Sequence, residues 1–394
     1  MVDEPQPAQG KDTATHNKLS VLGQLKDRRE QIVQSETLVL RVARWSDPEI
    51  FVRFKPIDHG IIRRGQERAE KLKGDAKFEA EVQANMGDCL AALLHFGEAL
   101  SCYDQALALD ARLARAWSGR GDALASLQRQ QEALDSYSRA LTLAPGDSGS
   151  WMRLATTLML MERHAEALAA YEKVGQLAPD TDYLCGTWLL ASMYMGRWAG
   201  WTQRFEDAIS RVDAGRKAAP PFSLMATPAG PATLLRSARI YGQDQCPSQR
   251  PVEFKAAVPG RKLRVGYFSN DFRNHATSPL MARLFECHDR SRFEWFGFSI
   301  GQHPPDAMRA RVAAGFDHFE QVGEQHDAQI AARARELEID IAVDLNGHTT
   351  GSRPNIFAGR AAPLQVNYLG FPGTMGCDYI DYIIADAFVI PPDD

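Results

Sequence analysis

A spacing of 34 residues recurs through the middle of this 394-residue chain. Small, aliphatic and aromatic residues repeat in register as Gly87, Gly121 and Ala155; Leu90, Leu124 and Leu158; Ala99, Ala133 and Ala167; Tyr103, Tyr137 and Tyr171; and Ala106, Ala140 and Val174. Trp117 also recurs as Trp151, and Pro145 as Pro179. A chance match at so many registered positions is improbable, so this part of the chain is expected to form stacked structural repeats.

The period and the residue types are typical of tetratricopeptide repeats, in which each unit is a pair of antiparallel helices. Small residues let the two helices approach closely, and the aromatic residue fills the space between successive pairs. Proline ends the second helix because it has no N–H to continue the hydrogen-bond ladder. We expect three repeats over residues 80–180, with Ala111 standing where later units have proline. Such arrays form a concave surface, which is predicted to bind peptides.

The segments on either side of the repeats carry weaker signals. Residues 1–18 are polar and mixed in charge, and we expect them to be disordered. Residues 19–79 are expected to be helical but show no repeat register and stay unassigned. Residues 181–260 are predicted to hold a capping helix pair, a proline-rich connector, a further helix near 231–244 and a second loop.

The hydrophobic period changes at Leu263, and residues 261–394 are predicted to form a separate Rossmann-like lobe. Short apolar strands are expected in LRVGYF, FEWFGFSIG, IDIAVDLNG, PLQVNYLGFPG and YIDYIIADAFVI, with helical segments between them. Apolar strands that alternate with helices favour a parallel sheet covered on both faces. The fold class is therefore an α-helical tetratricopeptide solenoid followed by an α/β lobe.

Ligands of open parallel sheets bind beyond the carboxyl ends of the strands. Three polar loops follow strands here, with the sequences SNDFRNHATSP, DLNGHTTGSRP and GFPGTMGCD. They are rich in glycine, serine and threonine, and two of them contain a histidine. A functional site is expected where these loops meet.

Composition narrows the classes of partner. The formal net charge is −5 and the pI is about 6.1, which gives no basic surface for nucleic acid. No run of about 18 apolar residues exists to span a membrane, and the polar N-terminus is unlike a secretory signal. The six cysteines are scattered and form no CxxC pair, so we expect a cytoplasmic protein without disulfides.

The loops also carry a family resemblance. LRVGYFSNDFRNHATSPLM and VDLNGHTTGSRPNIFAGRAAPLQVNYLGFPGTMGCDYIDYIIAD resemble the catalytic region of protein O-GlcNAc transferases, and the order of repeats, linker and lobe is similar. The resemblance implies the first half of a GT-B type glycosyltransferase. It implies inverting transfer of N-acetylglucosamine from UDP-GlcNAc to serine or threonine hydroxyls, with the repeats recruiting the acceptor protein. No cofactor and no metal are expected, in agreement with the lack of a DxD pair in a strand-end loop.

The resemblance also implies roles for individual residues. His275 matches the family histidine at the reacting centre, where it is a base or a positioning group, and a near-neutral imidazole suits the first role. Asp344 and His348 are the other candidate catalytic residues, with loop stabilisation as the alternative. The candidate substrate-binding residues, which offer side-chain donors or backbone N–H groups, are Asn346, Thr349, Thr350, Gly370, Pro372, Gly373 and Thr374.

The sequence closes on IPPDD, and in the resembled family a second lobe with most of the donor contacts follows that point. We therefore expect these residues to be part of a longer enzyme and to be inactive alone, because leaving-group stabilisation is a large share of catalysis. Two alternatives stay open. One is a non-catalytic, repeat-based binding scaffold with a vestigial lobe, and the other is a relative that transfers fucose from GDP-fucose.

Overall fold

The computed structural model describes residues 75–249, 252–255 and 260–390. The predictions for residues 1–18 and 19–79 lie outside these ranges, except for residues 75–79. The chain divides into two units, Met1–Gln83 and Ala84–Asp394, and the fold described below is that of the second together with residues 75–83, which begin its first helix. The predicted limits of the domains stay predictions.

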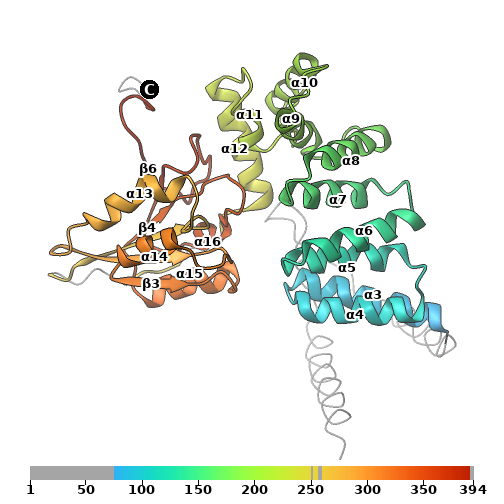
Figure 1. Cartoon of the computed structure of the whole chain (residues 1–394), viewed down its shortest axis with the longest axis horizontal. Coiled ribbons are helices and arrows are strands. Elements are labelled where there is room, and N and C mark those ends of the chain that lie inside the picture. The colour runs from blue at the N-terminus through green and yellow to red at the C-terminus, as the bar shows by residue number, and fades with distance from the viewer. Residues whose placement is uncertain (1–74, 250–251, 256–259, 391–394) are drawn as a thin grey trace, which may run out of the picture. The chain divides into compact units, whose positions relative to one another are not determined.

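Helices in antiparallel pairs form the first part of the described chain. They are α3 (Ala76–Ala92), α4 (Phe96–Leu109), α5 (Ala114–Ser126), α6 (Gln130–Leu143), α7 (Ser148–Leu160) and α8 (His164–Leu177). In Figure 1 they follow one another as a stack of hairpins from α3 to α8. The 34-residue register therefore predicted both the kind and the phase of these helices correctly.

Close packing between glycine and tyrosine explains the strict spacing. Tyr103 is only 2% exposed, and a Cβ added at Gly87 or Gly119 would lie 2.7 or 2.5 Å from its ring. The ring therefore occupies the space that a larger residue would need. The Tyr103 hydroxyl donates to Asp88 (2.7 Å), and the same bond joins Tyr137 to Asp122 (2.8 Å) one repeat later.

The helical region continues beyond the predicted repeats. Its elements are α9 (Leu184–Tyr194), α10 (Trp201–Asp213), α11 (Pro221–Leu224) and α12 (Pro231–Gln245). Helix α9 follows α7 at the 34-residue step and packs on α8, so α9 and α10 form a fourth, divergent pair. The pair shares a buried core with the repeats through Leu184, Trp188, Leu189, Ala208 and Val212, and its role as a cap stays a prediction.

A parallel sheet follows. Its strands are β1 (Leu263–Ser269), β2 (Phe293–Ser299), β3 (His318–Gln321), β4 (Ile341–Asp344), β5 (Leu364–Tyr368) and β6 (Tyr382–Ile384), in the order β3-β2-β1-β4-β5-β6. All five pairings are parallel. The five predicted strands are present, and β3 is a sixth that was not predicted, because its sequence HFEQ is short and mostly polar.

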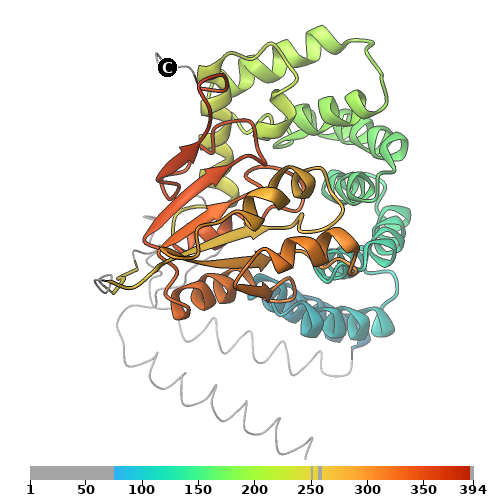
Figure 2. The same ribbon diagram turned by 60° about the vertical axis from the view of Figure 1, so that its left-hand side comes forward.

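Helices cover both faces of the sheet (Figure 2), and a separate core lies on each face. On one face α13 (Thr277–Glu286) and α14 (Ala307–Ala314) pack with Phe285, which is fully buried. On the other face α15 (Asp327–Glu336) and α16 (Asn355–Ala358) pack with Phe268 and Phe298, whose rings stack 4.3 Å apart. Helices on both faces leave the strand ends free to carry loops.

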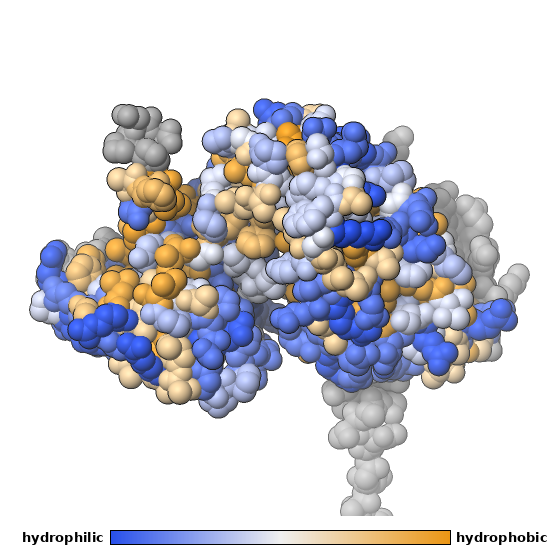
Figure 3. Space-filling view, turned by 45° about the horizontal axis from the view of Figure 1, so that its top comes forward, coloured by the Kyte–Doolittle hydropathy of each residue, from blue (hydrophilic) through white to orange (hydrophobic). Residues whose placement is uncertain are grey.

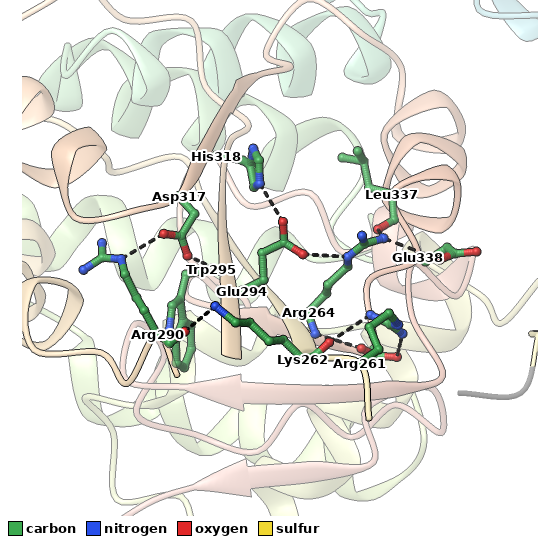
Figure 4. Close-up of polar contacts among 11 residues, drawn as sticks. Arg261, Lys262, Arg264, Arg290, Glu294, Trp295, Asp317, His318, Leu337 and Glu338 are labelled. Carbon is green, nitrogen blue, oxygen red and sulfur yellow. Dashed lines mark hydrogen bonds and ion pairs between the residues drawn. The ribbon is translucent and has the colours of Figure 1, made fainter. Parts of the chain in front are cut away.

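Ion pairs tie the amino ends of three strands together (Figure 4). Arg264 of β1 lies 2.8 Å from Glu294 of β2, which also contacts His318 of β3 at 2.8 Å. Arg290 and Asp317 form a second pair at 2.9 Å. These contacts brace the amino edge of the sheet, the edge opposite to the predicted site.

The last described segment is unusually apolar on its surface. Phe388 is 94% exposed, and Tyr382, Ile384 and Val389 are each more than half exposed. Figure 3 shows hydrophobic side chains gathered next to the grey C-terminal residues. No helix in the described ranges is long and apolar enough to cross a membrane.

Candidate functional site

The loops after β1 and β4 meet at the carboxyl edge of the sheet. These strands are neighbours, with Phe268 opposite Asp344. The backbone N–H of Asn270 donates to Oδ1 of Asn346 (2.8 Å), and Nδ2 of Asn346 donates to Asp271 (2.7 Å). Asn346 is 1% exposed, so its amide joins the two loops. Its predicted contact with substrate stays a prediction.

His275 lies in the β1 loop beside Asp271. Its Nδ1 is 3.8 Å from Oδ1 of Asp271 and 3.4 Å from the backbone N–H of Thr277. The side chain is 40% exposed, and within the described part of the chain Nε2 has no hydrogen-bond partner. Both contacts are to Nδ1, so Nε2 is left open, and the predicted catalytic role of His275 stays a prediction.

Asp271 was not among the predicted site residues. Its carboxylate is 6% exposed and also lies 3.6 Å from Arg273. Its own backbone carbonyl accepts from the Ser278 hydroxyl (2.6 Å) at the start of α13. Asp271 thus fixes the turn that carries His275. Its position two residues after the end of a strand was the only signal in the sequence.

Asp344 closes β4 and forms the next turn. It is 3% exposed and accepts from the backbone N–H groups of Asn346 (2.9 Å) and Gly347 (3.1 Å). Burial raises the pKa of its carboxyl, although these bonds and the nearby His348 oppose the shift. The side chain of Asn367 also favours the charged carboxylate, while neither of its amide atoms makes a hydrogen bond of normal geometry. Asp344 therefore braces this turn, and its predicted catalytic role stays a prediction.

His348 is 7% exposed and lies between two aromatic rings, Tyr241 of α12 and Phe371. Its Nε2 lies 2.9 Å from the carbonyl oxygen of Met375. A carbonyl only accepts, so Nε2 carries the proton. Nδ1 is buried and has no hydrogen-bond partner among the described residues. The imidazole therefore links the β4 loop to the β5 loop, which favours the loop-stabilising alternative without testing a direct role.

The two threonines after His348 differ in exposure. The Thr349 hydroxyl donates to the backbone carbonyl of Asn346 (2.9 Å) and is half-buried. Thr350 is exposed, and next to it Gly351 has φ +77° and packs against Asn270. Thr350 is thus the more available of the two for a ligand.

The loop after β5, residues 369–381, packs closely against the backbone of the β4 loop. A Cβ at Gly370 would overlap the backbone carbonyl of Leu345, so only glycine fits there. Pro372 and Thr374 are exposed. Within the described residues, the backbone N–H groups of Gly373 and Thr374 have no hydrogen-bond partner. These N–H groups could therefore bind the oxygen atoms of an anionic or sugar ligand.

Helix α12 holds the far side of this loop. A Cβ at Gly242 would lie 2.6 Å from Sγ of Cys377, and one at Gly376 would lie 2.7 Å from Ala238. The thiol of Cys377 donates to the Met375 carbonyl (3.2 Å). The linker thus supplies part of the site's support, which the sequence did not indicate.

No group of three or more histidine, cysteine, aspartate or glutamate side chains in the described ranges is arranged to hold a metal ion. The predicted sugar-nucleotide donor and the predicted independence from metal and cofactor stay predictions.

The arrangement defines a class: a helical-repeat protein with a Rossmann-like lobe and a polar site at the carboxyl edge. Residues 243–393 match the model of glycosyl transferase family 41, while residues 85–148 and 148–181 match tetratricopeptide repeat models. The lobe is therefore similar to glycosyl transferase family 41 over nearly its whole described length.

Two curated relatives have names that state an activity. The chain is 36% identical over 185 residues to the probable UDP-N-acetylglucosamine–peptide N-acetylglucosaminyltransferase SEC of Arabidopsis thaliana, covering 43% of this chain and 19% of the relative. It is 39% identical over 133 residues to the UDP-N-acetylglucosamine–peptide N-acetylglucosaminyltransferase of Caenorhabditis elegans, covering 34% and 12%. The matched region is thus less than a fifth of either relative.

One solved structure, a mutant of the Thermobaculum terrenum O-GlcNAc transferase, is similar over 81% of this chain and 55% of that chain. The identity is 21% and the TM-score is 0.48.

Proposed function

We propose that this chain is the repeat array and first catalytic lobe of an enzyme that transfers N-acetylglucosamine from UDP-GlcNAc to serine or threonine hydroxyls of proteins, with inversion. The main support is the carboxyl-edge site, where a half-exposed imidazole with an unpaired Nε2 stands beside a buried carboxylate. The family 41 match of the same loops and the names of the two relatives agree with this activity.

The proposed chemistry starts at His275. Its Nε2 accepts the proton of the acceptor hydroxyl as that oxygen attacks the anomeric carbon and the bond to the diphosphate breaks. Asp271 favours a proton on Nδ1 and so leaves the lone pair on Nε2. The contact from the Thr277 N–H favours the opposite tautomer. The two contacts, at 3.8 and 3.4 Å, are both long, so a bound acceptor decides between them.

The exposed backbone of Gly373 and Thr374 is proposed to bind the sugar or the phosphate. The repeats are proposed to recruit acceptor proteins, since arrays of this kind present a concave surface to polypeptides. We propose neither nucleic acid nor membrane as a partner. A cytoplasmic location is supported by six cysteines that are all free in the structure.

The test is transfer of radiolabelled N-acetylglucosamine to a serine-containing acceptor protein, using the protein with any residues that its gene encodes beyond residue 394. His275→Ala is expected to lower the rate by about 100-fold or more, the usual contribution of a general base. His318→Ala is the matched control, because His318 is similarly exposed (46%) and also contacts a carboxylate, at the opposite edge.

Full activity of His275→Ala would contradict the role of His275. Transfer from GDP-fucose but not from UDP-GlcNAc would assign the other sugar. Absence of transfer from either donor, with acceptor binding retained, would favour the scaffold alternative.

A further inference from the structure

The fourth helix pair breaks a pattern that the first three keep. In the first two repeats a buried tyrosine of the second helix donates to an aspartate of the first, Tyr103 to Asp88 and Tyr137 to Asp122. In the third repeat the same two positions are the buried Tyr171 and the polar Thr156. The equivalent positions of α10 and α9, 34 residues further on, are Phe205 and Leu190. Phenylalanine has no hydroxyl, so position 190 needs no acceptor. These positions along the first helices form a stripe that is polar in the three repeats and apolar in the fourth pair. Its residues are Asp88, Asp122, Thr156 and Leu190.

An open pocket of about 320 Å³ lies at this point. Its lining is Leu190, Met193, Tyr194, Phe222, Met225 and Ala226. No charged side chain lines it, and each of these residues is half-buried or exposed. Its volume is at the lower end of pockets that hold small ligands, roughly 300–1,000 Å³. It therefore suits one or two amino-acid side chains, and its two methionines can adapt to different shapes.

Contacts at both ends fix the pocket in place. Tyr194 is 56% exposed, but its ring stacks on His164 of α8 (centroids 4.3 Å apart, planes at 9°). At the other end, Sδ of Met225 lies 3.0 Å from where a Cβ of Gly373 would be. The pocket therefore begins on the stripe of the repeats and ends against the β5 loop of the candidate site.

We propose that this pocket binds an aliphatic side chain of the acceptor polypeptide, close to the residue that is modified. The inference rests on the proposed function. A polypeptide that lies along the first helices of the repeats and presents a hydroxyl at the carboxyl edge passes Leu190 and Met225. A sugar nucleotide does not fit, because the pocket offers no cation and, apart from the Tyr194 hydroxyl, no side-chain donor for phosphate.

The experiment measures binding of fluorescein-labelled 15-residue peptides by anisotropy, without a sugar donor. The peptides have a glycine–threonine background and one central serine, and a single leucine is moved through the other positions. A matched series carries aspartate instead. Leucine at one or two neighbouring positions is expected to tighten binding roughly tenfold, which is 1.4 kcal/mol, a part of what full burial of a leucine gives. Aspartate there should not tighten it.

Variants of the protein test whether the preference for leucine arises in this pocket. Leu190→Asp and Met225→Ala should each remove most of the leucine preference, and Leu143→Asp, at an exposed leucine of α6 outside the pocket, should leave it intact. Circular dichroism checks that Leu190→Asp folds. The methyl NMR signals of Met193 and Met225 give a second readout, since both should shift when the leucine peptide binds and neither should shift with the aspartate peptide.

Equal affinity at every leucine position, including no binding at all, would overturn the proposal, and so would a preference that survives both pocket variants. Failure of the proposed function has a different result. In that case the leucine preference and the methionine shifts would be present, while the transfer assay with UDP-GlcNAc or GDP-fucose would give no product.

Discussion

The two edges of the sheet use polar residues in different ways. At the amino edge, the charged groups of Figure 4 each have at least one polar partner, and a single carboxylate such as Glu294 serves both Arg264 and His318. At the carboxyl edge, Nδ1 of His348 and both amide atoms of Asn367 are buried and form no hydrogen bond of normal geometry with any described residue. Groups that are left unsatisfied in a folded protein need a reason. Nε of Arg261 and Nδ1 of His288 are likewise buried and unpaired among the described residues near the amino edge, so the two edges differ in their charges rather than in their unpaired atoms. The amino edge pairs its charged side chains, whereas the buried Asp344 of the carboxyl edge has no ion pair within the described residues, and we infer that this edge is the one shaped for a ligand.

The largest expected contrast between the edges comes from a pair of aspartates. Asp271→Asn removes the charge beside His275, and transfer should fall about 100-fold, as expected when a catalytic group is misplaced or held in the wrong tautomer. The control Asp317→Asn, at the amino edge, should leave the rate unchanged. Steady-state kinetics should show the Asp271 loss in kcat more than in KM. A rate within twofold of the parent for Asp271→Asn would show that the carboxylate does not act through His275.

Substitution of Asp344 tests whether a buried charge at the carboxyl edge lowers the free energy of unfolding. Burial raises the pKa of this carboxyl, so the charged form is unfavourable above the folded-state pKa, and the penalty is relieved as pH falls. Asp344→Asn keeps an acceptor for the two backbone N–H groups and adds a donor near Asn367. It should stabilise the protein at pH 7 by on the order of 1 kcal/mol. Urea unfolding at pH 7 and at about pH 4.5 measures this.

The gain from Asp344→Asn should shrink at the lower pH, since the parent carboxyl is then partly protonated. A variant that is less stable than the parent at pH 7 would mean that the charge of Asp344 stabilises the turn, and the two edges would then differ less than we infer.

The sequence predicted the repeats and the sheet because their signals are local. The register reflects a tyrosine packed against a glycine, which Tyr103 and Tyr137 repeat, and Tyr171 is buried at the next step, so it is visible as a period. The strand at His318–Gln321 was missed because its sequence contains only one strongly apolar residue, Phe319. It pairs with β2 on one side only, and this edge position does not require an apolar run.

The site was predicted at the level of its loops but not of its contacts. Asn346 carries two donors and an acceptor, and its sequence position gave no sign that the amide is turned toward Asp271, 75 residues away. Likewise, the aromatic enclosure of His348 includes Tyr241 from the linker. Such contacts depend on tertiary packing, so the sequence could identify candidate residues but could not separate those that face a ligand from those that brace the loops.

Arg264→Leu is expected to affect stability alone. The guanidinium pairs with Glu294 and also donates to the carbonyl of Leu337 (3.0 Å) at the end of α15. Both side chains of the pair are more than a quarter exposed, so the loss should be about 1–2 kcal/mol. Chemical denaturation measures it, and the rate of transfer at 25 °C should not change. A rate loss larger than twofold in folded protein would show that the amino edge is coupled to the site.

The smallest effect is expected at Glu294, and it concerns how the free energy of unfolding changes at acidic pH. Burial alone would raise the pKa of Glu294, but the bonds from His318 and Arg264 outweigh it, and the net pKa is lowered. A lowered folded-state pKa means that the carboxylate stabilises the protein above its unfolded pKa of about 4.3, and that this stability is lost as pH falls through the folded value. Glu294→Gln should therefore be less stable than the parent at pH 7 by up to about 1 kcal/mol, because the pair is partly exposed.

The difference between Glu294→Gln and the parent should narrow in urea titrations below about pH 4, where the parent carboxylate becomes protonated. Asp344→Asn should differ from the parent in the opposite direction over the same titration, since that carboxyl has a raised pKa. Parallel pH profiles for the two variants would remove the electrostatic distinction between the edges. Opposite profiles would leave the carboxyl edge as the one that holds a charge at a cost to stability, as a ligand-binding edge is expected to do.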